Sequence, residues 1–148
     1  MLKKQVISMA IPKAIGPYSP AIKIGDFIYL SGMLPVDIDG NIIKTTIEEQ
    51  TTQVMKNILA ILDEMDLKTY HIIKTTVYLD DLDDFDKMNT VYGEFFEEPF
   101  PARSCVEVSK LPKNAKIVID AVIIDTLKYE TDENPCSGCQ ELCDDCSE

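Results

Sequence analysis

The run IVIDAVII, Ile117–Ile124, is the segment that most constrains the fold. It is rich in β-branched residues and predicts a strand that extends from Lys116 to about Thr126. Its apolar residues occupy both alternating positions, so the strand needs cover on both faces of its sheet. Helices from the same chain can cover one face, and a second copy of the chain is the simplest cover for the other. The sequence therefore favours a homo-oligomer over the alternative, a deeper core within one chain.

The elements before this strand alternate between strands and helices. Gly25-Asp26 is typical of a hairpin turn, and Thr45 or Thr46 with a glutamate three residues later begins a helix. In order, the expected elements are strands at 21–24 and 27–31, a helix within 45–67, a strand at about 70–79, a helix from Asp83 that Pro99 and Pro101 terminate, and strands at 103–108 and 116–126. This β-β-α-β-α-β-β order predicts an α+β fold with a single mixed sheet covered on one face by two helices.

The charge and the apolar runs limit the classes of partner. The 148 residues carry a formal net charge of −12, which disfavours nucleic acid because a phosphate-binding protein usually presents a basic face. The longest apolar runs are far shorter than the ~20 residues that span a bilayer, and the first residues hold no apolar stretch typical of a secretory signal. We therefore expect a cytoplasmic protein with no membrane partner, which also fits cysteines that are not spread through the fold.

The composition changes near residue 127. From Tyr129 to Glu148 the chain has seven acidic residues and no lysine or arginine. Such a segment buries too little apolar surface to fold by itself. The sequence therefore predicts one domain at 1–127 and an acidic, cysteine-rich tail at 128–148.

The segment FPARSCVEVSKLP places a guanidinium and a thiol on one face of a strand, at Arg103 and Cys105. If this strand pairs antiparallel with the last one, Asp120 lies on the same wall. Two interpretations then stay open. One is a buried, structural Arg103–Asp120 ion pair, and the other is an anion site in which Arg103 binds a carboxylate through two hydrogen bonds.

Five segments together resemble the RidA/YjgF/L-PSP family: AIGPYSPAI, LSGMLPVD, IIKTTVYLDDLDDFDKMNTVYGEFF, FPARSCVEVSKLPK and KIVIDAVII. The resemblance runs from about Ile7 to Asp125 and leaves the tail outside. It implies a chorismate-mutase-like fold and a homotrimer with clefts between subunits. It also implies hydrolysis of 2-imino or enamine acids, such as 2-iminobutanoate and 2-iminopropanoate, to 2-oxo acids and ammonia. Such intermediates come from PLP-dependent dehydratases, so the implied role is metabolite damage control.

The resemblance also implies roles for individual residues. Arg103 matches the arginine that holds the substrate carboxylate. The other matching cleft residues are Tyr18, which shapes the pocket, Ser31 and Gly32 at its floor, Asn89 at its edge and Cys105 beside Arg103. We do not expect Cys105 to be a nucleophile, because that role needs an adjacent base and the one histidine, His71, is expected at the surface or at a strand end.

One position departs from the family pattern. The family stretch usually reads K-I-E-I-E-A, and here it is K-I-V-I-D-A, so Val118 replaces the glutamate that activates water. Asp120 points to the same side, one strand repeat of about 6–7 Å away, and is the candidate replacement base. The reaction needs no cofactor, since an imine carbon is already electrophilic. The alternative is a regulatory protein that binds small carboxylates or 2-oxo acids without turnover; a ribonuclease or translation inhibitor is disfavoured by the charge.

The tail carries a second motif, C-x₂-C-x₃-C-x₂-C. Its members are Cys136, Cys139, Cys143 and Cys146. Two C-x₂-C pairs so close together are typical of a soft metal site, for Zn²⁺ or an iron–sulfur cluster. The alternative is an acidic tail whose thiols bind metal only opportunistically.

Overall fold

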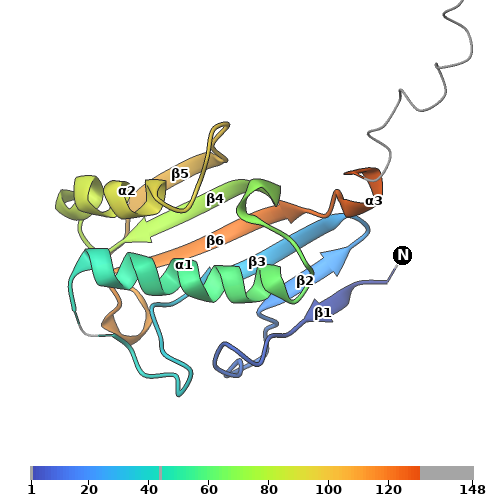
Figure 1. The fold of residues 1–148 in the computed structure, drawn as a ribbon. Coiled ribbons are helices and arrows are strands. Elements are labelled where there is room, and N and C mark those ends of the chain that lie inside the picture. The colour runs from blue at the N-terminus through green and yellow to red at the C-terminus, as the bar shows by residue number, and fades with distance from the viewer. Residues whose placement is uncertain (1, 44, 131–148) are drawn as a thin grey trace, which may run out of the picture.

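The computed structural model describes residues 2–43 and 45–130, and within them it shows a six-stranded sheet in the order β1-β2-β3-β6-β4-β5 (Figure 1). The strands are β1 (Lys4–Val6), β2 (Ala21–Ile24), β3 (Phe27–Met33), β4 (Ile72–Leu79), β5 (Ala102–Glu107) and β6 (Ile117–Ile124). The helices are α1 (Ile47–Asp63), α2 (Phe85–Gly93) and α3 (Leu127–Glu130), with 3₁₀ turns at Thr69–His71, Leu82–Asp84 and Pro112–Asn114.

The predicted α+β architecture is confirmed. The sheet is mixed, because β4 and β5 pair in parallel while the other neighbouring strands pair antiparallel. The strand β1, which pairs with β2 through Gln5 and Ile22, was not predicted from the sequence. Its three residues, KQV, show too little apolar alternation to predict a strand.

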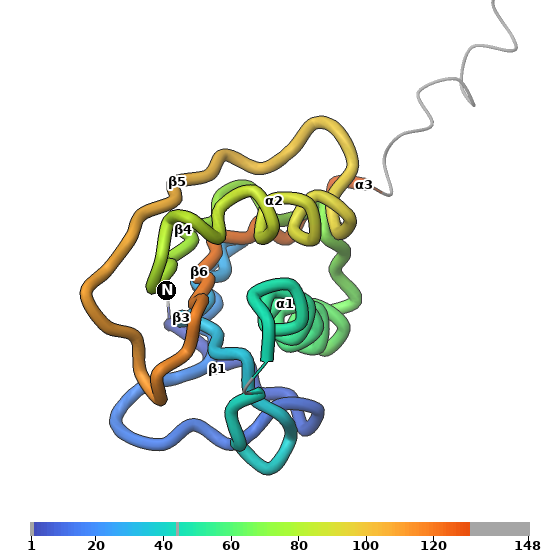
Figure 2. Tube along the Cα trace, turned by 90° about the vertical axis from the view of Figure 1, so that its left-hand side faces the viewer, coloured from blue at the N-terminus to red at the C-terminus, as the bar shows by residue number. Residues whose placement is uncertain are grey.

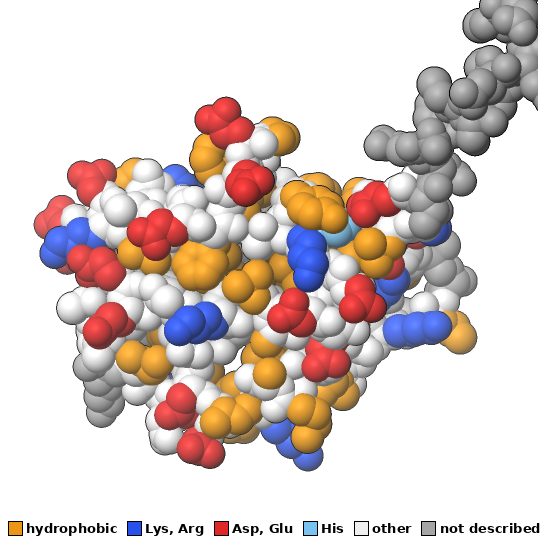
Figure 3. All heavy atoms as spheres, in the orientation of Figure 1, with side chains coloured by type: hydrophobic (Ala, Val, Ile, Leu, Met, Phe, Trp, Pro, Cys, Tyr) orange, Lys and Arg blue, Asp and Glu red, His pale blue; other side chains and the backbone are white. Residues whose placement is uncertain are grey.

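Both long helices, α1 and α2, lie on one side of the sheet (Figure 2). Thr46 begins α1, and its hydroxyl accepts the backbone N–H of Glu49 at 3.3 Å, as the capping signal predicts. The apolar stripe of α1 faces the sheet, where Val54, Ile58 and Ile61 are fully buried. Figure 3 views this helix-covered side, on which the basic side chains are isolated among acidic ones. No helix in the described part of the chain is long and apolar enough to cross a bilayer.

The other side of the sheet, which we call the outer face, has no helix over it (Figure 2). Phe27 and Tyr29 of β3 point to this side with 43% and 52% of their surface exposed, and their rings stack with centroids 6.5 Å apart. Ile124 lies beside Phe27, and Val122 lies beside Tyr29. The second apolar face of β6 therefore contributes to a surface that the described residues leave uncovered.

The predicted hairpin between the strand at 103–108 and the last strand is wrong. β4 lies between β5 and β6 and pairs with both. Thr75 of β4 is opposite Arg103, and its neighbour Thr76 is opposite Asp120. Since successive residues of a strand point to opposite faces, Arg103 lies on the helix side and Asp120 on the outer face. The apolar β6 takes a central position and the more polar β5 an edge, which separates two side chains that the hairpin would have joined.

The first residues of the predicted tail contact the body of the domain. Lys128 Nζ lies 2.6 Å from Asp26 Oδ1, and the Tyr129 hydroxyl donates to Asp26 Oδ2 at 2.9 Å. These two hydrogen bonds hold the pKa of Asp26 below its usual value, Lys128 contributing most. The short helix α3 thus spans the boundary predicted at residue 127.

Of the two places expected for His71, a strand end is correct and the surface is not. It does precede β4 directly, but its side chain is only 1% exposed. Its Nδ1 lies 2.9 Å from the backbone nitrogen of Lys68, and its Nε2 lies 3.0 Å from Glu130 Oε1. A histidine with both ring nitrogens engaged in this way connects the start of β4 to α3, and it is remote in the fold from β5 and Cys105.

Candidate functional site

Arg103 opens onto a pocket of about 410 Å³ beside α2. Its guanidinium lies over the ring of Tyr92, 4.8 Å from the centroid, and 5.5 Å from that of Phe85. Such stacking leaves the N–H edge of the guanidinium available for a planar anion. The pocket is lined by Asn89, Tyr92, Gly93, Phe100, Pro101 and Arg103.

The Tyr92 ring, which forms an aromatic platform under Arg103 together with Phe85, is held in place by a buried hydrogen bond. The Tyr92 hydroxyl and Thr75 Oγ1 lie 2.7 Å apart, and both residues are buried. Burial raises the pKa of Tyr92, against the smaller opposing effects of Thr75 and Arg103. The phenol therefore stays neutral near pH 7 and holds its ring under the guanidinium.

Within the described residues, no carboxylate lies within ion-pair distance of Arg103. The Arg103–Asp120 ion pair, one of the two interpretations above, does not form inside one chain, because the two side chains lie on opposite faces. Arg103 thus presents a positive charge, held by aromatic rings, to a pocket.

Cys105 lies two residues after Arg103 and packs against the core, half-buried. Burial raises the pKa of its thiol, and the opposing effect of Arg103 is smaller. The group is therefore a neutral thiol near pH 7. It is not among the residues that line the Arg103 pocket.

Three further predicted residues, Tyr18, Ser31 and Gly32, lie together and line a small cavity of about 60 Å³ at the far end of β3. Ser31 ties the loop that carries Tyr18 to the strand. Its hydroxyl donates to the carbonyl of Ser19 at 2.7 Å, and its backbone N–H donates to the carbonyl of Pro20 at 2.9 Å. Tyr18 itself is 53% exposed.

The register of β3 breaks at these residues. Leu30 pairs with Ala121 and Met33 with Ile119, so Ser31 and Gly32 together face the single residue Asp120. This two-against-one arrangement is a β-bulge, a feature that often lies next to active sites.

Val118 packs directly against Gly32. A Cβ atom on Gly32 would lie 2.8 Å from Val118 Cγ1, so a side chain there would collide with the valine. Val118 is only 8% exposed. Position 118 therefore supplies methyl groups to this floor and no carboxylate.

The predicted residues form two groups that one chain does not join. The Arg103 group (Asn89, Tyr92, Arg103) lies on the helix side at the β5 edge, and the Gly32 group (Tyr18, Ser31, Gly32) lies at the end of β3. β3 and β5 are three strand positions apart, roughly 14 Å at the usual spacing. A site that uses both groups needs a second copy of the chain.

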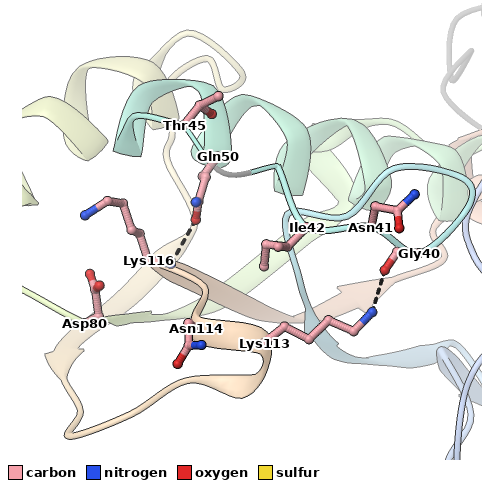
Figure 4. Close-up of a pocket in the computed structure, with 9 residues that line it drawn as sticks. All are labelled: Gly40, Asn41, Ile42, Thr45, Gln50, Asp80, Lys113, Asn114 and Lys116. Atoms are coloured by element: carbon pink, nitrogen blue, oxygen red, sulfur yellow. Dashed lines mark hydrogen bonds between the residues drawn. The ribbon is translucent and has the colours of Figure 1, made fainter.

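A separate cavity of about 690 Å³ lies between the start of α1 and the loop before β6 (Figure 4). Two contacts join residues of its lining. The backbone N–H of Lys116 donates to Gln50 Oε1 at 2.8 Å, and the ammonium of Lys113 contacts the carbonyl of Gly40. It contains none of the predicted site residues, and no sequence signal marked it.

The aromatic platform of Phe85 and Tyr92 was not predicted as part of the site. Phe85 and Tyr92 are seven residues apart, so they share a face of α2. That spacing, beside an arginine-bearing strand, is the signal that could have indicated it.

No group of three or more His, Cys, Asp or Glu side chains suited to a metal occurs within residues 2–43 and 45–130. The predicted metal ligands Cys136, Cys139, Cys143 and Cys146 lie outside the described residues.

Comparison with known proteins covers nearly the whole described chain. A RutC family protein of Pyrococcus abyssi is 50% identical over 123 residues, 82% of this chain and 97% of that protein. The 2-iminobutanoate/2-iminopropanoate deaminase of Salmonella typhimurium is 40% identical over 126 residues, 83% of this chain and 98% of that protein. Among solved structures, E. coli TdcF with bound serine has a TM-score of 0.77 at 37% identity and covers 82% of this chain and 98% of its own.

The family model described as Endoribonuclease L-PSP matches residues 8–124. That range contains every residue of the Arg103 and Gly32 groups. The chain therefore belongs to the RidA/YjgF/L-PSP family.

Proposed function

We propose that the protein hydrolyses small 2-imino acids to 2-oxo acids and ammonia. The observation that carries this proposal is Arg103, held over the Tyr92 ring without a carboxylate partner among the described residues and open to a pocket. A 2-imino acid has a planar carboxylate beside its reactive carbon. A guanidinium fork binds such a carboxylate and orients the C=N bond next to it.

The site is completed between subunits of a homotrimer in this proposal. The Arg103 group of one chain meets the Gly32 group of the next, since neither group alone surrounds a substrate. The uncovered outer face supports assembly, because Phe27, Tyr29 and their apolar neighbours on β6 offer surface to a second copy.

Two relatives support the chemistry. The Salmonella typhimurium relative bears the name of a deaminase for this substrate class, and the E. coli structure holds serine, a small amino acid with a carboxylate. No cofactor is needed in this proposal, since a protonated imine is electrophilic enough for attack by a positioned water. PLP-dependent dehydratases, which release such imines, are the proposed functional partners.

The direct test is a coupled assay in which a dehydratase generates 2-iminobutanoate in the presence of the protein. Wild type is expected to release 2-oxobutanoate and ammonia faster than buffer. Arg103→Ala should lower kcat/KM about 10- to 100-fold, because hydrogen bonds to a charged group contribute about 1.5–3 kcal/mol. Lys113→Ala, which removes a cation from the separate cavity, is the matched control.

Arg103→Lys refines this test, because it keeps the charge and loses the two-bond fork. We expect it to recover only part of the loss. Equal rates for wild type, Arg103→Ala and buffer would contradict the proposal.

The second candidate is a protein that binds 2-oxo acids or other small carboxylates without turnover and has a regulatory role. Val118 favours this second candidate, because the valine places methyl groups where a water-activating carboxylate is expected. Val118→Glu separates the two candidates. A gain of about 10²-fold or more in deaminase rate over an inactive wild type would support the binding role. The third candidate, a ribonuclease or translation inhibitor, is opposed by the net charge of −12.

We also propose that Cys136, Cys139, Cys143 and Cys146 bind a soft metal, on the strength of their spacing. Protein purified without a histidine tag or chelator should contain zinc or iron near one site per chain. A variant with these four cysteines changed to serine should contain none, and equal metal contents would contradict the proposal.

A further inference from the structure

Asp120 lies on the outer face of β6, between β3, which carries Ser31 and Gly32, and β4. On one side it faces the Ser31–Gly32 bulge of β3, and on the other it pairs with Thr76 of β4. Directly opposed residues in neighbouring strands have Cβ atoms about 4.5–5.5 Å apart. Asp120 is therefore the carboxylate adjacent to the floor residues Ser31 and Gly32.

Tyr78 holds this carboxylate. It stands opposite Val118 on β4, and its hydroxyl donates to Asp120 Oδ2 at 3.1 Å. That hydrogen bond raises the pKa of Tyr78, with burial and the charge of Asp120 acting in the same direction, so the phenol stays a donor near pH 7. Within the described residues, Asp120 Oδ1 makes no hydrogen bond, which leaves one oxygen to accept a proton.

The other titratable groups on this part of the outer face are few. Lys74 of β4 directs its ammonium to Thr76 Oγ1 at 3.3 Å, and Tyr29 of β3 lies opposite Val122. Among the described residues neither forms an ion pair or hydrogen bond with Asp120. Tyr78 is thus the group that sets the orientation of this carboxylate.

We propose that Asp120 is the base that activates the hydrolytic water, and that Tyr78 is the positioning residue that orients its carboxylate toward the Ser31–Gly32 floor. This inference rests on the proposed deaminase function. In this inference the Tyr78–Asp120 pair activates the hydrolytic water, because Val118 provides no carboxylate for that step.

The step balances without any further reactant. As the water oxygen bonds to the carbon of the protonated imine, Asp120 takes one water proton and the C=N π pair moves to nitrogen, which gives a neutral carbinolamine. The protonated Asp120 then returns its proton to that nitrogen. The C–N bond breaks, the C=O bond forms, and the leaving ammonia takes the hydroxyl proton as ammonium.

The test compares Asp120→Asn, Tyr78→Phe and the matched control Tyr70→Phe in the deaminase assay. Asp120→Asn keeps the size of the side chain and should lower kcat by 10²–10⁴-fold, the range for loss of a general base, with KM changed little. Tyr78→Phe should lower kcat about tenfold. Its KM should change little, because the lost hydrogen bond orients the base and does not contact the substrate carboxylate.

Tyr70→Phe removes an exposed phenol hydroxyl from the turn at Thr69–His71, outside the outer face and both site groups, and should leave kcat and KM unchanged. A merely structural role for the pair predicts lower melting temperatures in Asp120→Asn and Tyr78→Phe with the kcat of the folded protein unchanged. That result, or full kcat in Asp120→Asn, overturns the inference while an Arg103-dependent deaminase activity stands. An inactive wild type overturns the proposed function itself.

Discussion

At the scale of single residues, the position of Arg103 depends on a buried hydrogen bond beneath the Tyr92 ring. Thr75 faces Arg103 across the β4–β5 pair and bonds to the hydroxyl of Tyr92, whose ring lies under the guanidinium. Three side chains from β4, α2 and β5 therefore form one stack. Its lowest member is wholly buried, so it should act on stability as well as on the position of Arg103.

Thr75→Val tests this stack. The substitution keeps the shape and leaves the buried Tyr92 hydroxyl without a partner, which should lower the free energy of unfolding by about 1–3 kcal/mol. The measurement is urea unfolding at fixed protein concentration. Tyr92→Phe completes a double-mutant cycle, and we expect the two costs to be less than additive. Additive costs would contradict the coupling.

The residues of the site were predictable to different extents. Arg103, Tyr18, Ser31 and Gly32 carry motif letters that the sequence shows directly, and the structure places each beside a pocket. Tyr78 carries no motif of its own. Its contact with Asp120 depends on which strands are neighbours, and alternation along a strand specifies faces but not partners.

At the scale of elements, α1 ends in a turn that the sequence does not favour. Leu67 N–H donates to the Leu62 carbonyl at 3.0 Å and Asp66 N–H to the Asp63 carbonyl at 3.2 Å, which is the Schellman pattern. Asp66 occupies the left-handed position with φ of 58°, where glycine is usual. An acid at this end also opposes the helix dipole.

Asp66→Gly should therefore stabilise the protein by about 1 kcal/mol, since it removes both the strained Cβ and the unfavourable charge. Thermal unfolding would show a higher midpoint. Asp66→Ala removes the charge and keeps a Cβ at positive φ, so it should gain less than glycine or lose stability. An alanine variant as stable as the glycine variant would show that backbone strain is not the cause.

The order of the strands is the part of the fold that the sequence did not reveal. The strand and helix periodicities predicted which faces are apolar, and these assignments were correct for α1 and β6. An antiparallel pair of the strand at 103–108 with the last strand was the arrangement considered from the sequence. β4 takes the intervening place, since it has an inner face of Thr75, Val77 and Leu79 that is fully buried there.

At the scale of the whole molecule, the outer face and the two separated groups lead to one expectation. A single chain has an uncovered apolar surface, and its Arg103 and Gly32 groups line separate pockets. Assembly as proposed would cover the surface and bring the two groups together. Loss of assembly should then remove activity even where every site residue is intact.

Phe27→Asp tests this link. It places a charge on the outer face away from both groups, and we expect light scattering to show the mass of one chain instead of three, together with loss of deaminase activity. Leu82→Asp is the matched control, because Leu82 is exposed to a similar extent, 45% against 43% for Phe27, and lies in the turn before α2. An active Phe27→Asp monomer would contradict an inter-subunit site.

The bulge at Ser31–Gly32 has a consequence for how this fold tolerates insertions and deletions. Leu30, before the bulge, and Met33, after it, both point to the core. They are three positions apart, whereas residues on one face of a regular strand are separated by an even number of positions. Removing one residue there would restore regular pairing and leave Asp120 facing a single residue of β3 in place of the Ser31–Gly32 pair. The proposed site therefore depends on the length of β3, and deletion of one residue there should damage that site more than most substitutions.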